Sequence, residues 1–338
     1  AGTWQMSLYV SNPANEWVLW VSAKTAVNFQ LFVGTPENQR IMGEPVQIIG
    51  FLGEGEKPLA GQAVGVKVFG PNGAQSLMAL HDDGLHNDGT ANDGIYANFY
   101  SNGEQAGAYA VRGIAKGVDQ FGKPFELFKN TGLHLRPRVV YIHRGDVDTA
   151  NAYEQLIEAN GVAVDQLEMS NVPSTNLNKY NLVIIGPETG SLDTWGSDEI
   201  VRAIVKHEKP VLGLGEGGYA FFGKLGLAIG WGNGAHGQGT TVLRNNQADA
   251  IWHYPYDFDV AKERLWKLYV EDSRRVGIFL GDQPAGVDVF GFDDSDTRYA
   301  DIVMQSGRHM LWGFQDGPKQ MTDDGQKLMV NTVYRTMQ

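Results

Sequence analysis

One stretch of the chain carries an unusual concentration of oxygen ligands. It reads HDDGLHNDGTANDGIY over residues 81–96, and Asp83, Asp88 and Asp93 fall at equal steps with a glycine after each. Calcium takes about six to eight oxygens from carboxylates, side-chain amides and carbonyls, with glycine where the chain turns tightly. The stretch therefore predicts a structural calcium site with the ligand set Asp82, Asp83, Asn87, Asp88, Asn92 and Asp93.

The same stretch also has the composition of a series of turns. Asn and Asp side chains bond to nearby backbone amides, and glycine adopts positive φ, without any metal. The spacing differs from that of an EF-hand loop, in which the ligands alternate every second residue. Turns without metal therefore stay as an alternative to calcium, and a direct ligand-binding or catalytic role is a third.

A second stretch of chemical interest is the glycine-rich turn in PVLGLGEGGYAFFGKLG, residues 210–226. Backbone amides at such a turn into a helix can hold the pyrophosphate of a dinucleotide. In dinucleotide-binding folds, however, this turn follows the first strand, whereas several predicted strands precede residue 210. The position disfavours nucleotide binding and favours an elbow that presents residue 215 between a strand and a helix.

Polar and glycine residues follow the apolar strands in the second half of the chain. Open α/β sheets bind ligands outside the carboxyl ends of their strands, so these residues predict a ligand-binding crevice. Its members are His143, Arg144, Asp146, Gly186, Glu188, Gly215, Glu216 and Gly217.

Part of this crevice could also do chemistry. Glu216, His143 and Asp146, joined by His236 from the loop GWGNGAHGQGTT, could bind a metal or catalyse hydrolysis. The same residues have structural interpretations, in which His143 ends a strand, His236 is solvated and Glu216 caps its helix. Both interpretations stay open at the level of the sequence.

Composition and charge exclude several classes of function. A net charge of −12 argues against a nucleic-acid partner, and no apolar run approaches the ~18 residues of a membrane span. The absence of cysteine excludes disulfides and a cysteine nucleophile. The N-terminus lacks the basic and apolar regions of a signal peptide, as a secreted protein does after processing. Exposed aromatic residues could bind carbohydrate or a protein partner.

The elements that carry these residues divide the chain in two. Short alternating strands between turn signals predict an antiparallel, Ig-like β-sandwich over residues 37–135, preceded by a β segment over residues 1–36 that could belong to a separate sheet. From residue 136 to 338, strands alternate with amphipathic helices, which predicts an α/β domain on a parallel sheet. Residues 227–300 are harder to order and predict an insertion at the sheet edge.

The acidic stretch and the strands after it carry a resemblance. The run SLMALHDDGLHNDGTANDGIYANFY resembles the β-domain that follows the von Willebrand factor A domain in secreted proteins related to calcium-activated chloride channel regulators. The resemblance implies an extracellular accessory sandwich and no particular reaction. It covers about 45 residues, and the chain has no von Willebrand domain.

The elbow and the end of the chain resemble class I glutamine amidotransferase domains, which have a flavodoxin-like three-layer α/β fold. PVLGLGEGG is similar to the family's P-V-x-G-[IV]-C-x-G, NLVIIGPETG to its D-x-[IVL]-I-[IL]-x-G-G-P, and WGFQDGPK to its G-V-Q-F-H-P-E. Gly215 stands at the position of the Cys nucleophile, Gly317 at that of the His and Lys319 at that of the Glu. Acyl transfer needs all three roles, so the resemblance implies a pseudoenzyme.

Together these features predict a secreted or cell-surface protein without catalytic activity. It would combine a calcium-stabilised sandwich with an amidotransferase-like domain that lacks the triad, and it would act through a protein partner or self-association. One alternative is a hydrolase that uses residues around Glu216. The other is a binder of small molecules or carbohydrate without turnover.

Overall fold

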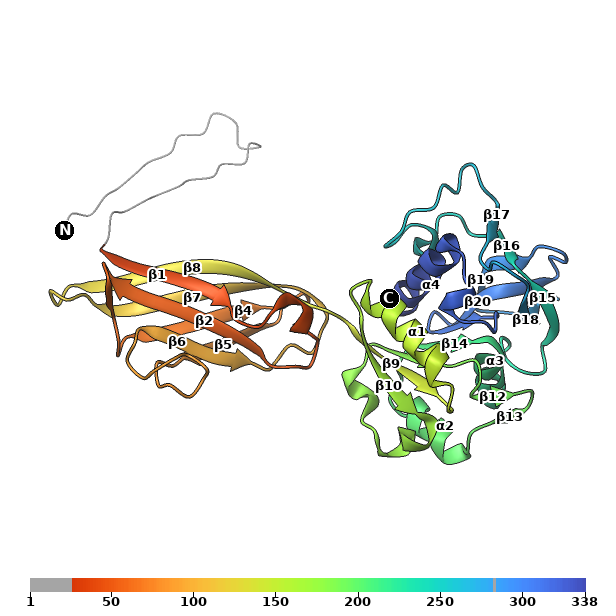
Figure 1. Cartoon of the computed structure of the whole chain (residues 1–338), viewed down its shortest axis with the longest axis horizontal. Coiled ribbons are helices and arrows are strands. Elements are labelled where there is room, and N and C mark those ends of the chain that lie inside the picture. Colours follow the sequence, from red (N-terminus) through yellow and green to blue (C-terminus); the bar gives the residue numbers. More distant parts are fainter. Residues whose placement is uncertain (1–25, 282–283) are drawn as a thin grey trace.

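The computed structural model describes residues 26–281 and 284–338. Figure 1 shows that these residues form two lobes joined by one extended connection. The N-terminal lobe has two antiparallel sheets, and the C-terminal lobe is an α/β domain. This confirms the predicted fold class. None of the helices in the described ranges has the length and apolar character of a membrane span.

The N-terminal lobe is a sandwich with one core between its two sheets. Its strands alternate buried and exposed residues, as expected where one face of a strand meets a core. Val66 and Val111 from one sheet share that core with Ile48 from the other. One sheet contains β1 (Val27–Val33), β2 (Val46–Glu54), β3 (Lys57–Pro58) and β6 (Ile95–Tyr100), and the other, in order, β5 (Gln75–Leu80), β4 (Ala63–Phe69), β7 (Gly107–Val118) and β8 (Pro124–Leu135).

Strand β1 corrects one expectation. Residues 1–36 were interpreted as a β segment that could belong to a separate sheet, but β1 pairs antiparallel with β2 from end to end. Phe29 and Leu31 point into the sandwich core, and burial of these side chains ties the strand to this lobe. The remaining strands predicted in this segment fall on residues 1–25, which lie outside the described residues.

The C-terminal lobe is built on a mixed sheet. Its parallel part has the order β10, β9, β11, β14 and β21, and antiparallel strands continue it. Consecutive residues of β9 face opposite sides, so Tyr141 lies in one core and Ile142 in the other. The parallel strands are β9 (Arg138–His143), β10 (Ala163–Glu168), β11 (Leu182–Ile185), β14 (Val211–Leu214) and β21 (His309–Trp312).

Four helices cover the two faces of this sheet. Tyr153 of α1 (Val147–Glu158) and Leu328 of α4 (Asp323–Thr336) belong to one core cluster. Ile204 of α2 (Asp198–Val205) and Phe221 of α3 (Gly215–Lys224) belong to the other. The lobe therefore has three layers, helix, sheet and helix.

Residues 227–300 form most of the antiparallel part of the same sheet. After β21 the sheet continues in the order β20, β19, β16 and β17. Strand β18 also pairs with β20, and β15 pairs with β18. The stretch thus widens the central sheet and does not fold apart from it. Its strands are β15 (Gly234–Gly239), β16 (Thr241–Arg244), β17 (Leu265–Lys267), β18 (Ser273–Phe279) and β19 (Val287–Asp293), and β20 (Tyr299–Gln305) begins at its end.

Only Arg136 and Pro137 connect β8 of the sandwich to β9 of the α/β lobe. The Arg136 guanidinium donates to the carbonyl of Asn38 in the sandwich at 2.8 Å and to the carbonyls of Gly161 and Glu158 in the α/β lobe at 3.2 and 3.4 Å. One side chain therefore bridges main-chain atoms of both lobes. We call this set of bonds the joint.

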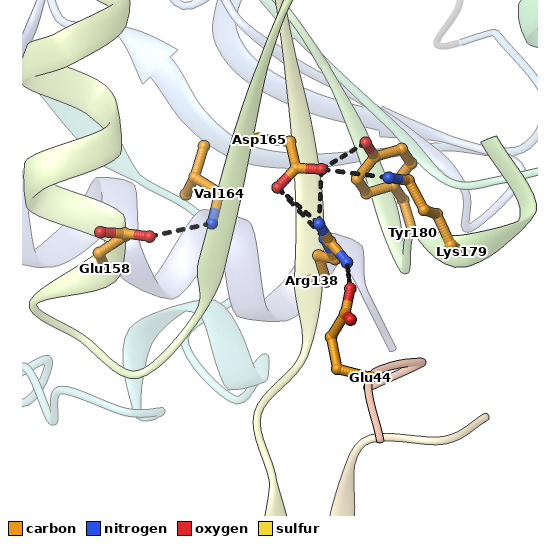
Figure 2. A network of polar contacts seen from close by, with 7 residues as sticks. All are labelled: Glu44, Arg138, Glu158, Val164, Asp165, Lys179 and Tyr180. Carbon is orange, nitrogen blue, oxygen red and sulfur yellow. Dashed lines mark hydrogen bonds and ion pairs between the residues drawn. The ribbon is translucent and has the colours of Figure 1, made fainter. Parts of the chain in front are cut away.

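Figure 2 shows a second link between the lobes, made by Arg138. Arg138 Nη2 lies 2.9 Å from Asp165 Oδ2, and Arg138 Nη1 lies 2.5 Å from Glu44 Oε1 of the sandwich. Burial opposes ionisation of Asp165, but hydrogen bonds from Tyr180 and Arg138 outweigh it and lower the pKa of this carboxyl. Asp165 therefore holds Arg138 in place to meet Glu44. We call Glu44, Arg138 and Asp165 the latch.

Candidate functional site

The elbow between β14 and α3 has the backbone geometry that its sequence predicts. Gly215 has a φ of +49°, in the left-handed region that favours glycine. A Cβ on this residue would lie 2.5 Å from Gln315 Oε1 and 3.0 Å from the carbonyl oxygen of Phe314. The space in which a nucleophile would stand is therefore occupied.

Gln315 fills the elbow and uses its hydrogen-bonding groups. Its Oε1 accepts from the Glu216 amide at 2.9 Å, and its Nε2 donates to the carbonyl of Pro187 at 3.1 Å. The Gly217 amide donates to the same carbonyl at 2.9 Å. Amides at an elbow stabilise the oxyanion of an acyl intermediate only when they are available to it. Here both are bonded within the protein.

The other two amidotransferase positions are also without catalytic groups. Gly317 is buried, and a Cβ added to it would contact Thr149 Cγ2 at 3.1 Å and the Tyr153 ring at 3.7 Å. Lys319 is exposed in a short 3-10 helix, Pro318–Gln320. No nucleophile, base or orienting carboxylate stands at residues 215, 317 and 319.

Glu216 and His236 do meet. His236 Nε2 lies 2.6 Å from Glu216 Oε2, and the other carboxylate oxygen accepts from the Leu192 amide at 2.7 Å. His236 comes from the edge strand β15 and packs against the ring of Tyr219. The pair lines a pocket of about 350 Å³, which Glu188 and Arg274 also line.

His143, Arg144 and Asp146 make their contacts elsewhere in the crevice. His143 Nδ1 lies 3.3 Å from Glu168 Oε2, and Asp146 caps α1 by accepting from the Thr149 amide at 3.1 Å. The Arg144 amide donates to Glu188 Oε1 at 2.9 Å. The structure therefore pairs Glu216 with His236 and places His143 and Asp146 in a separate set of contacts.

Glu188 connects the two sets. Its Oε1 accepts from Arg144, whereas Oε2 is buried without a hydrogen-bond partner. Burial raises the pKa of Glu188 and the charge of Asp146 adds to the rise, while the Arg144 amide opposes it. Its environment therefore favours the protonated form of Glu188.

The glycines of the crevice permit close packing. A Cβ on Gly217 would lie 2.1 Å from the carbonyl oxygen of Gly186, and one on Gly186 would lie 2.8 Å from the carbonyl oxygen of Ile142. The start of α3 therefore approaches the end of β11 at a distance that only glycine allows. Their role in the structure is to seat the helix against the sheet.

The Asp-Gly stretch forms a loop between β5 and β6, in the sandwich. Asp82 accepts from the amides of Asp93 and Gly94, both at 3.0 Å, and Asp88 Oδ2 accepts from the Asp83 amide at 2.8 Å. Asp83 accepts from Leu85, and Asp93 from Thr90. Asn87 and Asn92 have positive φ, 56° and 66°. Turn chemistry thus uses most of the predicted calcium ligands.

One oxygen of this loop has no partner. Asp88 is 1% exposed, and its Oδ1 is buried without a hydrogen bond. A buried carboxylate oxygen is costly unless a donor or a cation satisfies it. Across residues 26–281 and 284–338, no group of three or more His, Asp or Glu side chains is arranged to hold a metal ion.

These features describe a two-domain protein with an Ig-like sandwich and an α/β domain whose elbow is filled. Residues 51–131 match the family described as the conditioned medium factor second Ig-like domain. Among curated proteins, no sequence matches this chain. The Ig-like character of the sandwich therefore has independent support.

Several solved structures align with more than half of this chain. A protein assigned as part of a GMP synthase, from Thermoplasma acidophilum, has 11% identity over 60% of this chain and 95% of that chain, with a TM-score of 0.41. PurLQS from Thermotoga maritima has 15% identity over 59% of this chain and 99% of that chain, with a TM-score of 0.39. A cell-surface-expressed chitinase from a Paenibacillus species has 8% identity over 57% and 17%, with a TM-score of 0.23. These values are too low to carry any activity over to this chain.

The residue that fills the elbow, Gln315, had no role in the sequence prediction. Gln315 belongs to the motif WGFQDGPK, but only its neighbours were assigned to catalytic positions. The glutamine in the family's motif G-V-Q-F-H-P-E was the available signal. What the sequence could not show is that its side chain turns back onto Gly215, because that contact joins residues 100 positions apart.

Proposed function

We propose that this chain is an extracellular binding or assembly protein without catalytic activity. The observation that carries the proposal is the Gln315 side chain in the elbow, bonded to the Glu216 amide at 2.9 Å. It takes both the space of a nucleophile and a donor that an oxyanion would need. An α/β domain with its elbow closed in this way is suited to present a surface.

One observation supports the extracellular location. Residues 51–131 of the sandwich match a family described as the conditioned medium factor second Ig-like domain. Fractionation of the producing cells tests the location. Recovery of the protein only from the cytosol would contradict it.

The test of the non-catalytic part measures ammonia release from glutamine. We expect none from the wild-type protein, and none from Gln315→Ala, which opens the elbow without supplying a nucleophile. Hydrolysis of glutamine by the wild type would overturn the proposal. Light scattering over a range of concentrations tests assembly, since a protein that stays monomeric at every concentration would contradict self-association.

A hydrolase is the second candidate, and the Glu216–His236 pair is the observation that favours it. The 2.6 Å distance between these side chains is within the reach that proton transfer requires. Glu216→Gln and His236→Asn would each abolish such an activity toward simple esters and glycosides. If the wild type turns over none of these substrates, the pair is structural, holding β15 against α3.

We also propose calcium as a structural ion of the Asp-Gly loop. The unpartnered, buried Asp88 Oδ1 supports it, because calcium would satisfy that oxygen. The melting temperature of the wild type should fall by several degrees when a chelator is added, and that of Asp88→Asn should not change. An unchanged wild-type melting temperature, with no calcium found by elemental analysis, would leave turn chemistry as the explanation.

A further inference from the structure

A large cleft lies between the lobes, on the side of the joint. It has a volume of about 1000 Å³, and both lobes line it, the sandwich through Glu37 and Glu104 and the α/β lobe through Glu158 and Tyr254. We propose that this cleft binds an extended, lysine-bearing segment of a partner protein. The inference rests on the proposed binding function and names a partner chemistry for it.

The first support is unbalanced charge. None of the ion pairs between described residues includes Glu37, Glu104 or Glu158. Among the described lining residues there is no lysine, and Arg136 directs its guanidinium donors at main-chain carbonyls of the joint. The cleft lining therefore has three carboxylates, from both lobes, against the single guanidinium of Arg136, and a cationic partner is the complement of this excess negative charge.

The second support is a tyrosine at the cleft wall. Tyr254 is 53% exposed, and its ring packs edge to face on Tyr334 with the centroids 5.4 Å apart. Tyr334 is fixed in turn by its hydroxyl, which donates to the carbonyl of Asn160 at 2.8 Å. The Tyr254 ring is thus held in place with one side toward solvent. Such a ring attracts an ammonium group, and the apolar stem of a lysine packs against it.

The third support is the size and polarity of the cleft. A volume of about 1000 Å³ lies at the upper end of the range for small-molecule sites, so a short diamine or triamine would leave much of it to water. Asn38 and Gln105 also line the cleft, and their side-chain amides bond to no other described residue. Such amides pair with the backbone of an extended peptide. These features favour a peptide segment over a free polyamine.

The test uses the full chain and a fluorescent peptide of alternating glycine and lysine. We expect it to bind, and raising the salt concentration from 50 to 300 mM should weaken binding by about tenfold, because exposed charges are screened. A peptide in which glutamate replaces lysine should not bind. No binding of the lysine peptide overturns the proposal. Equally tight binding of spermidine also overturns it, in favour of a polyamine site.

Variants locate the peptide. Glu104→Gln combined with Glu158→Gln should reduce affinity for the peptide by about fivefold to thirtyfold, because the variant lacks two carboxylates that would pair with lysines. The control combines Glu56→Gln with Glu271→Gln, which removes the same charge from exposed positions of the two lobes outside the cleft. The control should bind within about twofold of wild type. Equal losses in the two variants would show attraction by net charge alone and would contradict a site in the cleft.

Tyr254 supplies a check that does not change charge. Tyr254→Ala should reduce affinity by about twofold to fivefold, whereas Tyr254→Phe, which keeps the ring, should bind like the wild type. A loss in both variants would contradict the role of the ring. Because the peptide assay does not involve the elbow, its failure leaves the non-catalytic proposal standing, and glutamine hydrolysis would overturn that proposal alone.

Discussion

At the scale of single residues, the position of the Gln315 side chain depends on residue 215 being glycine. The left-handed φ of Gly215 favours glycine, and Gln315 occupies the volume that any side chain there would need. Adding a cysteine at this position would therefore disturb the fold before it supplied any chemistry. The glycine at residue 215 and the Gln315 contact therefore form one structural arrangement.

Gly215→Ala tests this arrangement. It should lower the free energy of unfolding by about 1–3 kcal/mol, from backbone strain and the 2.5 Å approach to Gln315. Gly226→Ala is the matched control, because Gly226 also has a positive φ but would place its Cβ in open space. It should cost only about 1 kcal/mol. Denaturant unfolding measures both, and equal costs would show that the Gln315 contact is unimportant.

A buried charge cluster sets a pH dependence. Arg275 lies 2.9 Å from Asp301 and 2.6 Å from Asp293, with Asp294 at 3.5 Å, so one guanidinium faces three carboxylates. Burial raises the pKa of Asp301 to about 8, although Arg275 opposes the rise. Asp301 is fully buried, and the raised pKa means that folding favours the protonated form of this carboxyl.

The sign of the effect follows from this proton. Between the unfolded pKa of about 4 and the folded pKa of about 8, the folded state binds more protons, so stability falls as pH rises. We expect a loss of about 3 kcal/mol between pH 5 and 8 for the wild type. Asp301→Asn should flatten this dependence, and the exposed Asp288→Asn should not. Denaturant unfolding at pH 5 and pH 8 measures the change in the free energy of unfolding. If this free energy changed as little with pH in the wild type as in Asp301→Asn, Asp301 would not be the source of the pH dependence.

At the scale of elements, much could be predicted from the sequence where periodicity is strong. The alternation of strands and amphipathic helices after residue 136 was predicted correctly, as β9 and α2 show, because local patterns decide both kinds of element. Some contacts between distant segments were predicted, such as the proximity of His236 to Glu216 and the place of residues 227–300 at the sheet edge. The pairing of β1 with β2 and the contact of Gln315 with Gly215 could not be predicted, because they depend on tertiary packing.

The latch between the lobes is the element-scale feature that can be tested. Glu44→Gln removes the charge that Arg138 meets across the lobes and leaves Arg138 bonded to Asp165. The distribution of distances between spin labels on the two lobes should broaden, while the melting temperature changes little, because Glu44 is half-exposed. Lys116 and Glu126 form an ion pair within the sandwich, so Glu126→Gln is a control that should leave the distribution unchanged.

At the scale of the whole molecule, two separate cores imply two cooperative units. The sandwich core shares no residue with the two clusters of the α/β lobe, and polar contacts of the joint and latch connect the lobes. Calorimetry should therefore resolve two transitions. Leu52→Ala should lower the free energy of unfolding of the sandwich alone, by about 2–5 kcal/mol, and so shift only its transition to lower temperature. Leu311→Ala should do the same for the α/β lobe alone. A single transition that moves with either substitution would contradict independent lobes.

The joint has a consequence for how this architecture can diverge. In the joint, the Arg136 guanidinium donates only to the main-chain carbonyl oxygens of residues 38, 158 and 161, and every residue type has such a carbonyl. Side chains at 38 and 158 can therefore change without loosening the two lobes. These two residues also line the cleft. Selection could thus alter what the cleft accepts while the arrangement of the lobes stays constant.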